Sequence, residues 1–397
     1  MAAVSCQPLL NVESGTRSSH YIRTVYDGET VSDSLLPKSK FDTVLYYSTV
    51  EFPSGYDWKR DSACGNSKAT LTIYRNFEPL GSFETGENSC IGTDPDTHHW
   101  LEGNLYTEYN LYGQTVITKN GKELFRYNGQ EFLKGLLVRG EEVWTLGQNS
   151  NGKGFSLRRN GEALLTDTQG QVFGDLTSSA HGALYMDSEQ ICFCYQRQAE
   201  SAYNMYKVSD SHTTLVGSSV RTIYDMIILD GKVSFAAGDG RSVLLERESG
   251  SLHIGGSSGG IENAWLCRGG QGETVCFAEK GGSDPEYFVW SGGISKRIGS
   301  CSQIFMYSQP DRTFKYARIS GLGISLCDGD RGVLRSFPKP GLISRSCIKF
   351  MGNESFLAYN GQNGDSRIVF KGRDVPVNVN GYVSALDVTI IKEEEEK

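Results

Sequence analysis

Long apolar runs and an excess of positive charge are both missing from this sequence of 397 residues. No stretch approaches the roughly 18 consecutive apolar residues that a membrane-spanning helix needs, so we expect no such helix. The formal net charge of −8 argues against a nucleic acid or an anionic membrane held by bulk electrostatics. Aromatic residues make up 11% of the chain, so the low-aromatic composition typical of disorder is absent too.

Helix-period patterns are also scarce, and a recurring turn takes their place. A short strand with alternating apolar residues runs into Asn-Gly or a close relative, and a second strand follows at once. The clearest copies read TVITKNGKELF, GFSLRRNGEALL and VLLERESGSLHI. Eight such turns lie between Asn76 and Gly372, about 42 residues apart, which is the period of a four-stranded propeller blade. The pattern predicts an all-β chain.

The expected fold class is a single closed β-propeller with eight four-stranded blades, or seven if one weak turn is an embellishment. After the last outer strand, residues 383–391 supply one more inner-strand pattern, while 41–48 and 69–76 read as second and third strands. We therefore predict that the C-terminal strand completes the first blade. A rival inner strand lies at 21–26 (YIRTVY).

The two ends of the chain lie outside this repeat. We expect residues 1–40 to form a partly extended N-terminal arm, 41–392 the propeller, and 393–397 a charged, disordered tail. The start, MAAVSCQPLL, lacks the basic region and apolar core of a signal peptide, which indicates a cytoplasmic protein as written. If a leader was removed before Cys6, an exported or surface-anchored protein is expected instead.

The ten cysteines are scattered, and most lie inside strand patterns. Cys192 and Cys194 are two residues apart on a strand, so they share a face and cannot easily bridge each other. A large repeat protein does not need a disulfide framework. We expect buried, reduced cysteines that act as small apolar residues, and no metal site.

The strand–Asn-Gly–strand blades resemble those of uncharacterised bacterial β-propellers, over roughly residues 41–391. The Gly-His and Trp-Asp pairs of WD40 blades are not present, nor are the signatures of kelch and sialidase-like blades. The resemblance therefore implies a fold and no activity, because propellers host many unrelated functions.

Candidate site residues are those near the starts of inner strands, where ligands usually meet a propeller. Asp96, His98 and His99 belong to the densest polar cluster, DPDTHHW, whose side chains could bind a metal or act as acid and base. The two histidines are neighbours on a strand and should point to opposite faces, so an ordinary hydrogen-bonded loop is the alternative.

Three more carboxylates, Asp175, Asp225 and Asp387, recur near inner strands. They could line a channel and bind a cation or a sugar hydroxyl. Because an unpaired buried charge is costly, the alternative is that each accepts hydrogen bonds from a neighbouring blade.

Aromatic residues complete the candidate set. Trp265 and Tyr307 could stack on a sugar ring, although filling gaps between blades is the usual role of such side chains. Trp58 lies in a long loop, FPSGYDWKRDSACGNSK, and is the better candidate for an exposed contact.

These observations favour a non-enzymatic scaffold that binds a protein or glycan partner through its channel face, with no cofactor and an unknown oligomeric state. The alternative is a glycan-active hydrolase or lyase with Asp and His residues converging at the channel mouth. We assign no catalytic residue from the sequence.

Overall fold

The computed structural model is built from strands. It describes residues 41–56, 68–84, 89–90, 98–101, 103–173, 183–187, 190–197, 200, 202–209, 212–229, 232–247, 249–256, 259–269, 272–280, 284–308, 314–329, 331–361 and 364–392. Among these residues the helical content is one 3-10 turn, η2 (Arg345–Cys347). No helix in the described part of the chain is long and apolar enough to cross a membrane.

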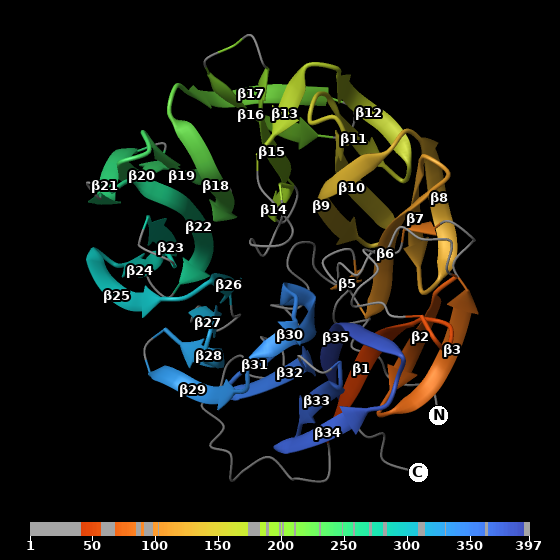
Figure 1. The fold of residues 1–397 in the computed structure, drawn as a ribbon. Helices are drawn as coiled ribbons and strands as arrows, with labels where there is room; N and C mark the ends of the chain where they lie inside the picture. Colours follow the sequence, from red (N-terminus) through yellow and green to blue (C-terminus); the bar gives the residue numbers. More distant parts are fainter. Residues whose placement is uncertain are drawn as a thin grey trace. The chain divides into compact units, whose positions relative to one another are not determined.

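The strands form eight antiparallel sheets, which are the blades of a β-propeller (Figure 1). The fold class is therefore the predicted one, with eight blades rather than seven. By contacts the described chain divides into two units, and each is described by itself: the first unit contains 41–130 and 340–392, the second 131–339.

The first unit holds three blades. Blade 1 consists of β35 (Gly381–Lys392), β1 (Phe41–Glu51), β2 (Thr70–Arg75) and β3 (Glu78–Glu84). Blade 2 consists of β4 (Ser89–Cys90), β5 (His98–Leu101), β6 (Asn104–Leu111), β7 (Gln114–Lys119) and β8 (Lys122–Asn128). Blade 8 consists of β30 (Pro340–Leu342), β31 (Ile348–Met351), β32 (Glu354–Gly361), β33 (Ser366–Phe370) and β34 (Arg373–Val377).

The second unit holds five blades. Blade 3 has β9 (Glu131–Arg139), β10 (Glu142–Asn149), β11 (Phe155–Arg159) and β12 (Glu162–Asp167). Blade 4 has β13 (Gly170–Val172), β14 (Tyr185–Asp187), β15 (Gln190–Arg197), β16 (Tyr203–Ser209) and β17 (His212–Ser219). Blade 5 has β18 (Thr222–Leu229), β19 (Lys232–Gly238), β20 (Ser242–Arg247) and β21 (Gly250–Gly256). Blade 6 has β22 (Ile261–Gly269), β23 (Gly272–Glu279), β24 (Glu286–Ser291) and β25 (Ile294–Ser300). Blade 7 has β26 (Gln303–Ser308), β27 (Phe314–Ser320), β28 (Gly323–Asp328) and β29 (Gly332–Phe337).

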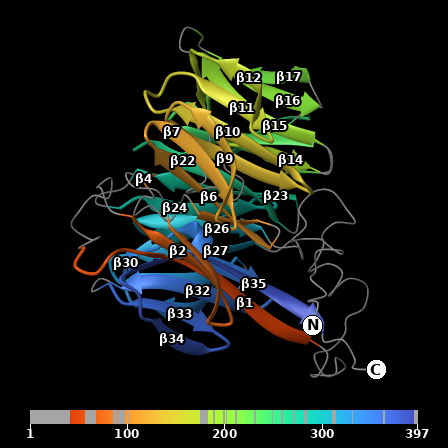
Figure 2. The same cartoon turned by 90° about the vertical axis from the view of Figure 1, so that its right-hand side faces the viewer.

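The C-terminal strand completes the first blade, as predicted. β35 pairs antiparallel with β1 from Phe41 opposite Lys392 to Glu51 opposite Gly381 (Figure 2). Ser48 and Ser384 also join their hydroxyl groups across this pair, at 2.9 Å. The rival strand at 21–26 and the expected arm and tail lie outside the described residues.

The recurring Asn-Gly turn has a simple physical basis. Asn120 and Asn160 adopt left-handed backbone conformations, with φ of 48° and 51°. Each side-chain oxygen accepts a hydrogen bond from the second strand of the same blade, from the Leu105 and Val143 amides at 2.9 and 2.8 Å. Asparagine tolerates this conformation and supplies the acceptor. The turn therefore fixes the hairpin of the third and outer strands and also holds the second strand of the blade beside it.

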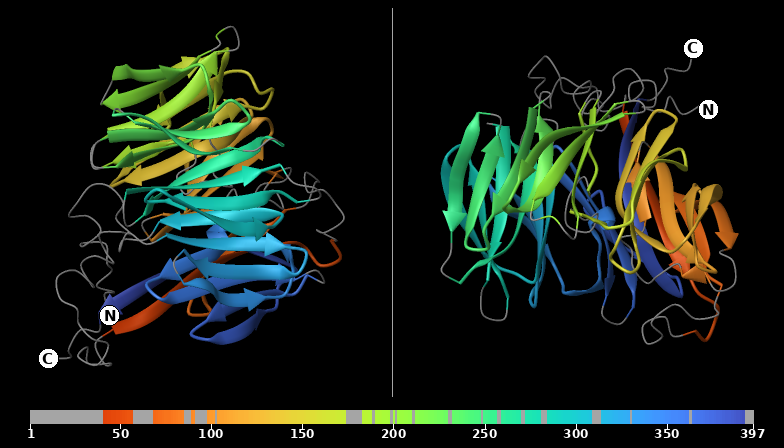
Figure 3. Two further views of the ribbon diagram at one scale, coloured as in Figure 1. Left: turned by 90° about the vertical axis from the view of Figure 1, so that its left-hand side faces the viewer. Right: turned by 90° about the horizontal axis from the view of Figure 1, so that it is seen from above.

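The hydrophobic core lies between successive sheets. In the second unit the sheets stack as layers (Figure 3), and one buried cluster joins blade 6 to blade 7 through Trp265, Tyr287, Met306 and Tyr316. The seven cysteines whose side chains are described are buried, and four of them belong to this cluster. They therefore serve as small apolar residues, as expected.

Three inner strands differ from the predicted parse because they are interrupted. In blades 2, 4 and 8 the inner strand consists of two short pieces that pair with the same second strand. In blade 8 the interruption is described in full and contains η2. This interruption places Arg345 and Ser346 in the 3-10 turn instead of in a strand.

Candidate functional site

The candidate site lies in the first unit, where the inner segments of three blades meet. β35 contacts both β5 and β31, and η2 contacts β35 and β5. We call the polar residues that these segments carry the inner-strand cluster: His98, His99 and Trp100 on β5, Arg345 and Ser346 in η2, Lys349 on β31 and Asp387 on β35.

His98 is the most unusual member of the cluster. Its side chain is fully buried, and neither ring nitrogen has a hydrogen-bond partner within the described part of the chain. Burial, and then the charge of His99, lowers the pKa of His98 to about 3. The imidazole is therefore neutral near pH 7, with one donor and one acceptor available.

His99 lies on the opposite face of β5 and is half-buried. Its Nδ1 atom is 3.5 Å from the hydroxyl oxygen of Ser346 in η2, which links blade 2 to blade 8. The next residue, Trp100, places its ring 5.8 Å from that of Tyr46 on β1. The two histidines thus diverge, as the alternation of a strand requires.

Asp387 lies on β35 and is buried to 8% exposure. One carboxylate oxygen is 2.8 Å from the Lys349 ammonium group of the neighbouring blade 8. The structure therefore brings Asp387 into the same unit as His98 and His99, but its charge is already balanced by a lysine.

Asp225 lies in the second unit, on β18, and joins three blades. It accepts hydrogen bonds from the Tyr185 hydroxyl on β14, from its own neighbour Met226 N at 2.8 Å, and from Leu266 N on β22 at 2.7 Å. Burial, and then the Asp225 charge, raises the pKa of Tyr185 well above its ordinary value. This geometry fits the structural role that the sequence left open as the alternative.

The aromatic candidates of the second unit are buried. Trp265 is 7% exposed and stacks on Tyr287 with ring centroids 5.9 Å apart. Tyr307 on β26 is buried as well. Both side chains fill space between or within blades, which leaves little of either ring for a sugar to stack on.

Three candidate residues, Trp58, Asp96 and Asp175, lie outside the described residues. Asp96 falls in the interruption between β4 and β5, and Asp175 in that between β13 and β14. Their proposed roles remain predictions.

Other buried charges in the second unit are paired within the protein. Arg158 donates two hydrogen bonds to Glu131, at 2.7 and 2.8 Å, and Lys315 donates one to Asp328 at 2.9 Å. Among the described residues no group of three or more His, Cys, Asp or Glu side chains is arranged to hold a metal ion.

Exposed apolar residues at one end of several blades were not among the candidates predicted from the sequence. Phe132 begins an inner strand and Val220 precedes one, while Tyr112 and Leu322 lie in turns between second and third strands, at the same blade end. Leu322 is 95% exposed. The signal was present in the sequence, because a leucine between two glycines, Gly321-Leu322-Gly323, is an unusual choice for a tight turn.

The chain is similar to several solved structures at low sequence identity. Dihydro-heme d1 dehydrogenase NirN, in complex with DHE, matches with a TM-score of 0.53 and 12% identity over 86% of this chain and 74% of that one. Oligogalacturonate lyase in complex with manganese matches with 0.48 and 10% identity over 90% and 99% of the two chains. The β-propeller domain of Myceliophteria thermophila Cps50 (Swd1) matches with 0.40 and 11% identity over 66% and 90%.

At such low identities the likeness concerns the fold alone. No family model matches the chain, and no curated protein matches its sequence.

Proposed function

We propose that this chain is a propeller scaffold that binds a protein partner through the blade ends at which the inner strands begin. The observation that supports it is the uneven distribution of exposed apolar side chains. In the described part of the chain, the large apolar residues exposed outside the outer strands are Tyr112, Phe132, Val220 and Leu322, and each lies at that end of its own blade.

The conformation of Tyr112 strengthens this proposal. It has a left-handed φ of 51°, a conformation that asparagine or glycine adopts more easily, and its side chain is 72% exposed. A non-glycine residue in this conformation costs about 1 kcal/mol or more. Exposed aromatic residues of this kind are typical anchors of protein interfaces.

The test is a capture experiment with the double variant Tyr112→Asn, Leu322→Asn as bait, in extracts of the source cells. We expect the variant to lose partners that the wild-type protein captures, because its interface anchors are gone. The matched control is Ile294→Asn, which changes an equally exposed residue, 73% exposed, on the outer strand β25. Equal capture by all three proteins, or no capture by the wild type, would contradict the proposal.

A glycan-active hydrolase or lyase is the second candidate, and one observation favours it. His98 is buried and neutral and has no partner among the described residues, as a group kept for a ligand would. Against it, Asp387 is ion-paired with Lys349. Thermal shift with a panel of glycans separates the two functions, because only the second predicts stabilisation that His98→Gln removes.

A further inference from the structure

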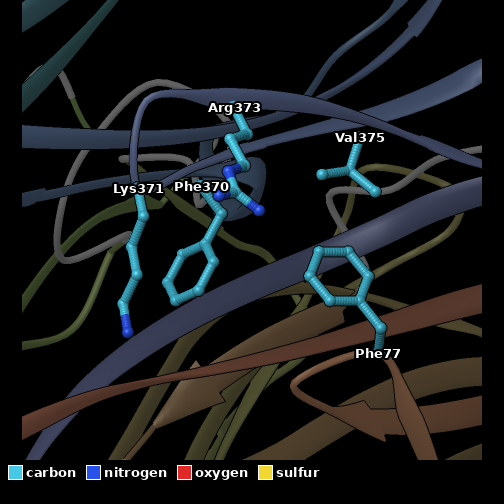
Figure 4. A pocket seen from close by; sticks show the side chains of 5 residues that line it. All are labelled: Phe77, Phe370, Lys371, Arg373 and Val375. Carbon is cyan, nitrogen blue, oxygen red and sulfur yellow. The ribbon is translucent and has the colours of Figure 1, made fainter.

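A pocket in the first unit combines aromatic and cationic side chains. Its volume is about 400 Å³, and it is lined by Phe77 from the β2–β3 turn and by Phe370, Lys371, Arg373 and Val375 from the β33–β34 hairpin (Figure 4). This volume is within the range of pockets that hold small molecules.

The turn that contains Phe77 differs in sequence from the corresponding turns of blades 2 and 3. In blades 2 and 3 the second turn position is glycine, Gly121 and Gly161, with φ of 79° and 82°. In blade 1 the turn reads Asn76-Phe77, and Phe77 has a φ of 72°. Asn76 still accepts its hydrogen bond, from Leu45 N at 2.9 Å, so the turn type is unchanged and phenylalanine stands where glycine is favoured.

The neighbouring junction shows what usually fills this space. At Gly121 a Cβ atom would lie 2.1 Å from the ring of Phe83, so the outer strand β3 of blade 1 packs its aromatic residue directly onto the glycine. At the junction of blades 8 and 1 the aromatic residue comes from the turn itself. Phe77 meets Phe370 edge to face, with centroids 6.5 Å apart, and also packs on Tyr47 at 5.7 Å.

Two cationic side chains, Lys371 and Arg373, lie beside the rings of Phe77 and Phe370. The Lys371 ammonium nitrogen is 5.3 Å from the centroid of the Phe370 ring, and Arg373 lines the pocket from the adjacent strand. Asp374 points to the other face of β34, where it accepts a hydrogen bond from Arg367 at 2.9 Å. In a chain with a net charge of −8, two cations beside two phenyl rings suit an aromatic anion.

We propose that this pocket binds a small aromatic carboxylate, whose ring packs on Phe77 and Phe370 and whose carboxylate faces Lys371 and Arg373. In this proposal the strained backbone of Phe77 is tolerated because its ring forms part of the binding surface. The glycines at the same turn position in blades 2 and 3, Gly121 and Gly161, only reverse the direction of the chain. This inference does not depend on the proposed protein partner.

The probe is 2-naphthoate, titrated into the full chain and followed by its fluorescence, with neutral 2-naphthamide as its matched analogue. Phe77→Gly restores the turn of the neighbouring blades, so the variant should fold, and we expect it to bind about tenfold more weakly or worse. We expect Arg373→Gln to weaken binding about fivefold, and Lys122→Gln, in the corresponding turn of blade 2, to leave it unchanged.

Equal affinity of wild type and Phe77→Gly would overturn the inference, and so would equal affinity for naphthoate and naphthamide. A chain that stops after Lys392, without the acidic residues of 393–397, tests a rival occupant. If this shortened chain binds 2-naphthoate much more tightly, the pocket serves the chain's own tail and not a free acid. Unchanged affinity supports the free acid.

Discussion

Asp225 in the second unit and His98 in the first are both buried polar residues on the inner strands of their blades, yet their surroundings are opposite. Asp225 accepts hydrogen bonds from three blades, whereas His98 has no partner among the described residues. A buried polar group without a partner costs about 1–3 kcal/mol. Asp225 thus stabilises the contacts among inner strands of the second unit. In the first unit the imidazole of His98 stays available for another interaction.

The largest effect should follow the loss of Asp225. Asp225→Ala removes the acceptor of the Tyr185 hydroxyl and of the Leu266 amide, and it leaves the Met226 amide only its longer hydrogen bond to the Tyr185 hydroxyl oxygen, at 3.2 Å. We therefore expect a loss of about 3–5 kcal/mol in the free energy of unfolding. Urea unfolding measures it. The control is Asp239→Ala, which removes an exposed acceptor from a turn and should cost about 1 kcal/mol or less. Equal losses of unfolding free energy for Asp225→Ala and Asp239→Ala would show that the hydrogen bonds of Asp225 between blades contribute no special stability.

The next effect is a pH dependence that comes from His98. Its pKa is lowered by burial from 6.5 to about 3 in the folded state, so the unfolded state binds more protons between these values. The contribution of His98 to stability should therefore be complete above pH 6.5 and fall as the pH drops towards 3, by at most about 1.4 kcal/mol per pH unit.

The variant His98→Leu isolates this contribution, because it removes the titrating group and no hydrogen bond seen in the described residues. We expect its unfolding free energy to fall less steeply than that of the wild type between pH 6.5 and 4.5, and to match the wild type within about 1 kcal/mol at pH 8. Parallel pH profiles would show that His98 does not titrate as its burial implies.

The smallest effect should come from Tyr185→Phe, which removes one of the three donors to Asp225 and keeps the ring. We expect a loss of about 1 kcal/mol, well below that of Asp225→Ala, because both amide donors remain. Thermal unfolding of the three proteins side by side checks the order. A loss as large as that of Asp225→Ala would mean that the hydrogen bond from Tyr185 accounts for most of the stabilisation that Asp225 provides.

The fold could be predicted because its signals are local. Asn120 and Asn160 fix hairpins through contacts within one blade. The strand pattern at 383–391 follows the last complete blade, and the first blade lacked an inner strand, which this pattern could supply. The candidate site is less readable. It depends on interrupted inner strands that bring β5, η2 and β35 together, and no local pattern shows that His98 is fully buried or that Phe77 and Phe370 line one pocket.

The pairing of β1 with β35 also sets an order of events during synthesis. Ser48 and its partner Ser384 are 336 residues apart, so a ribosome adding about 5–20 residues per second needs tens of seconds between them. During that time β1 has an unsatisfied edge that other chains could pair with. Pairing with β35 covers this edge of β1 only after the residues of β35 have been synthesised.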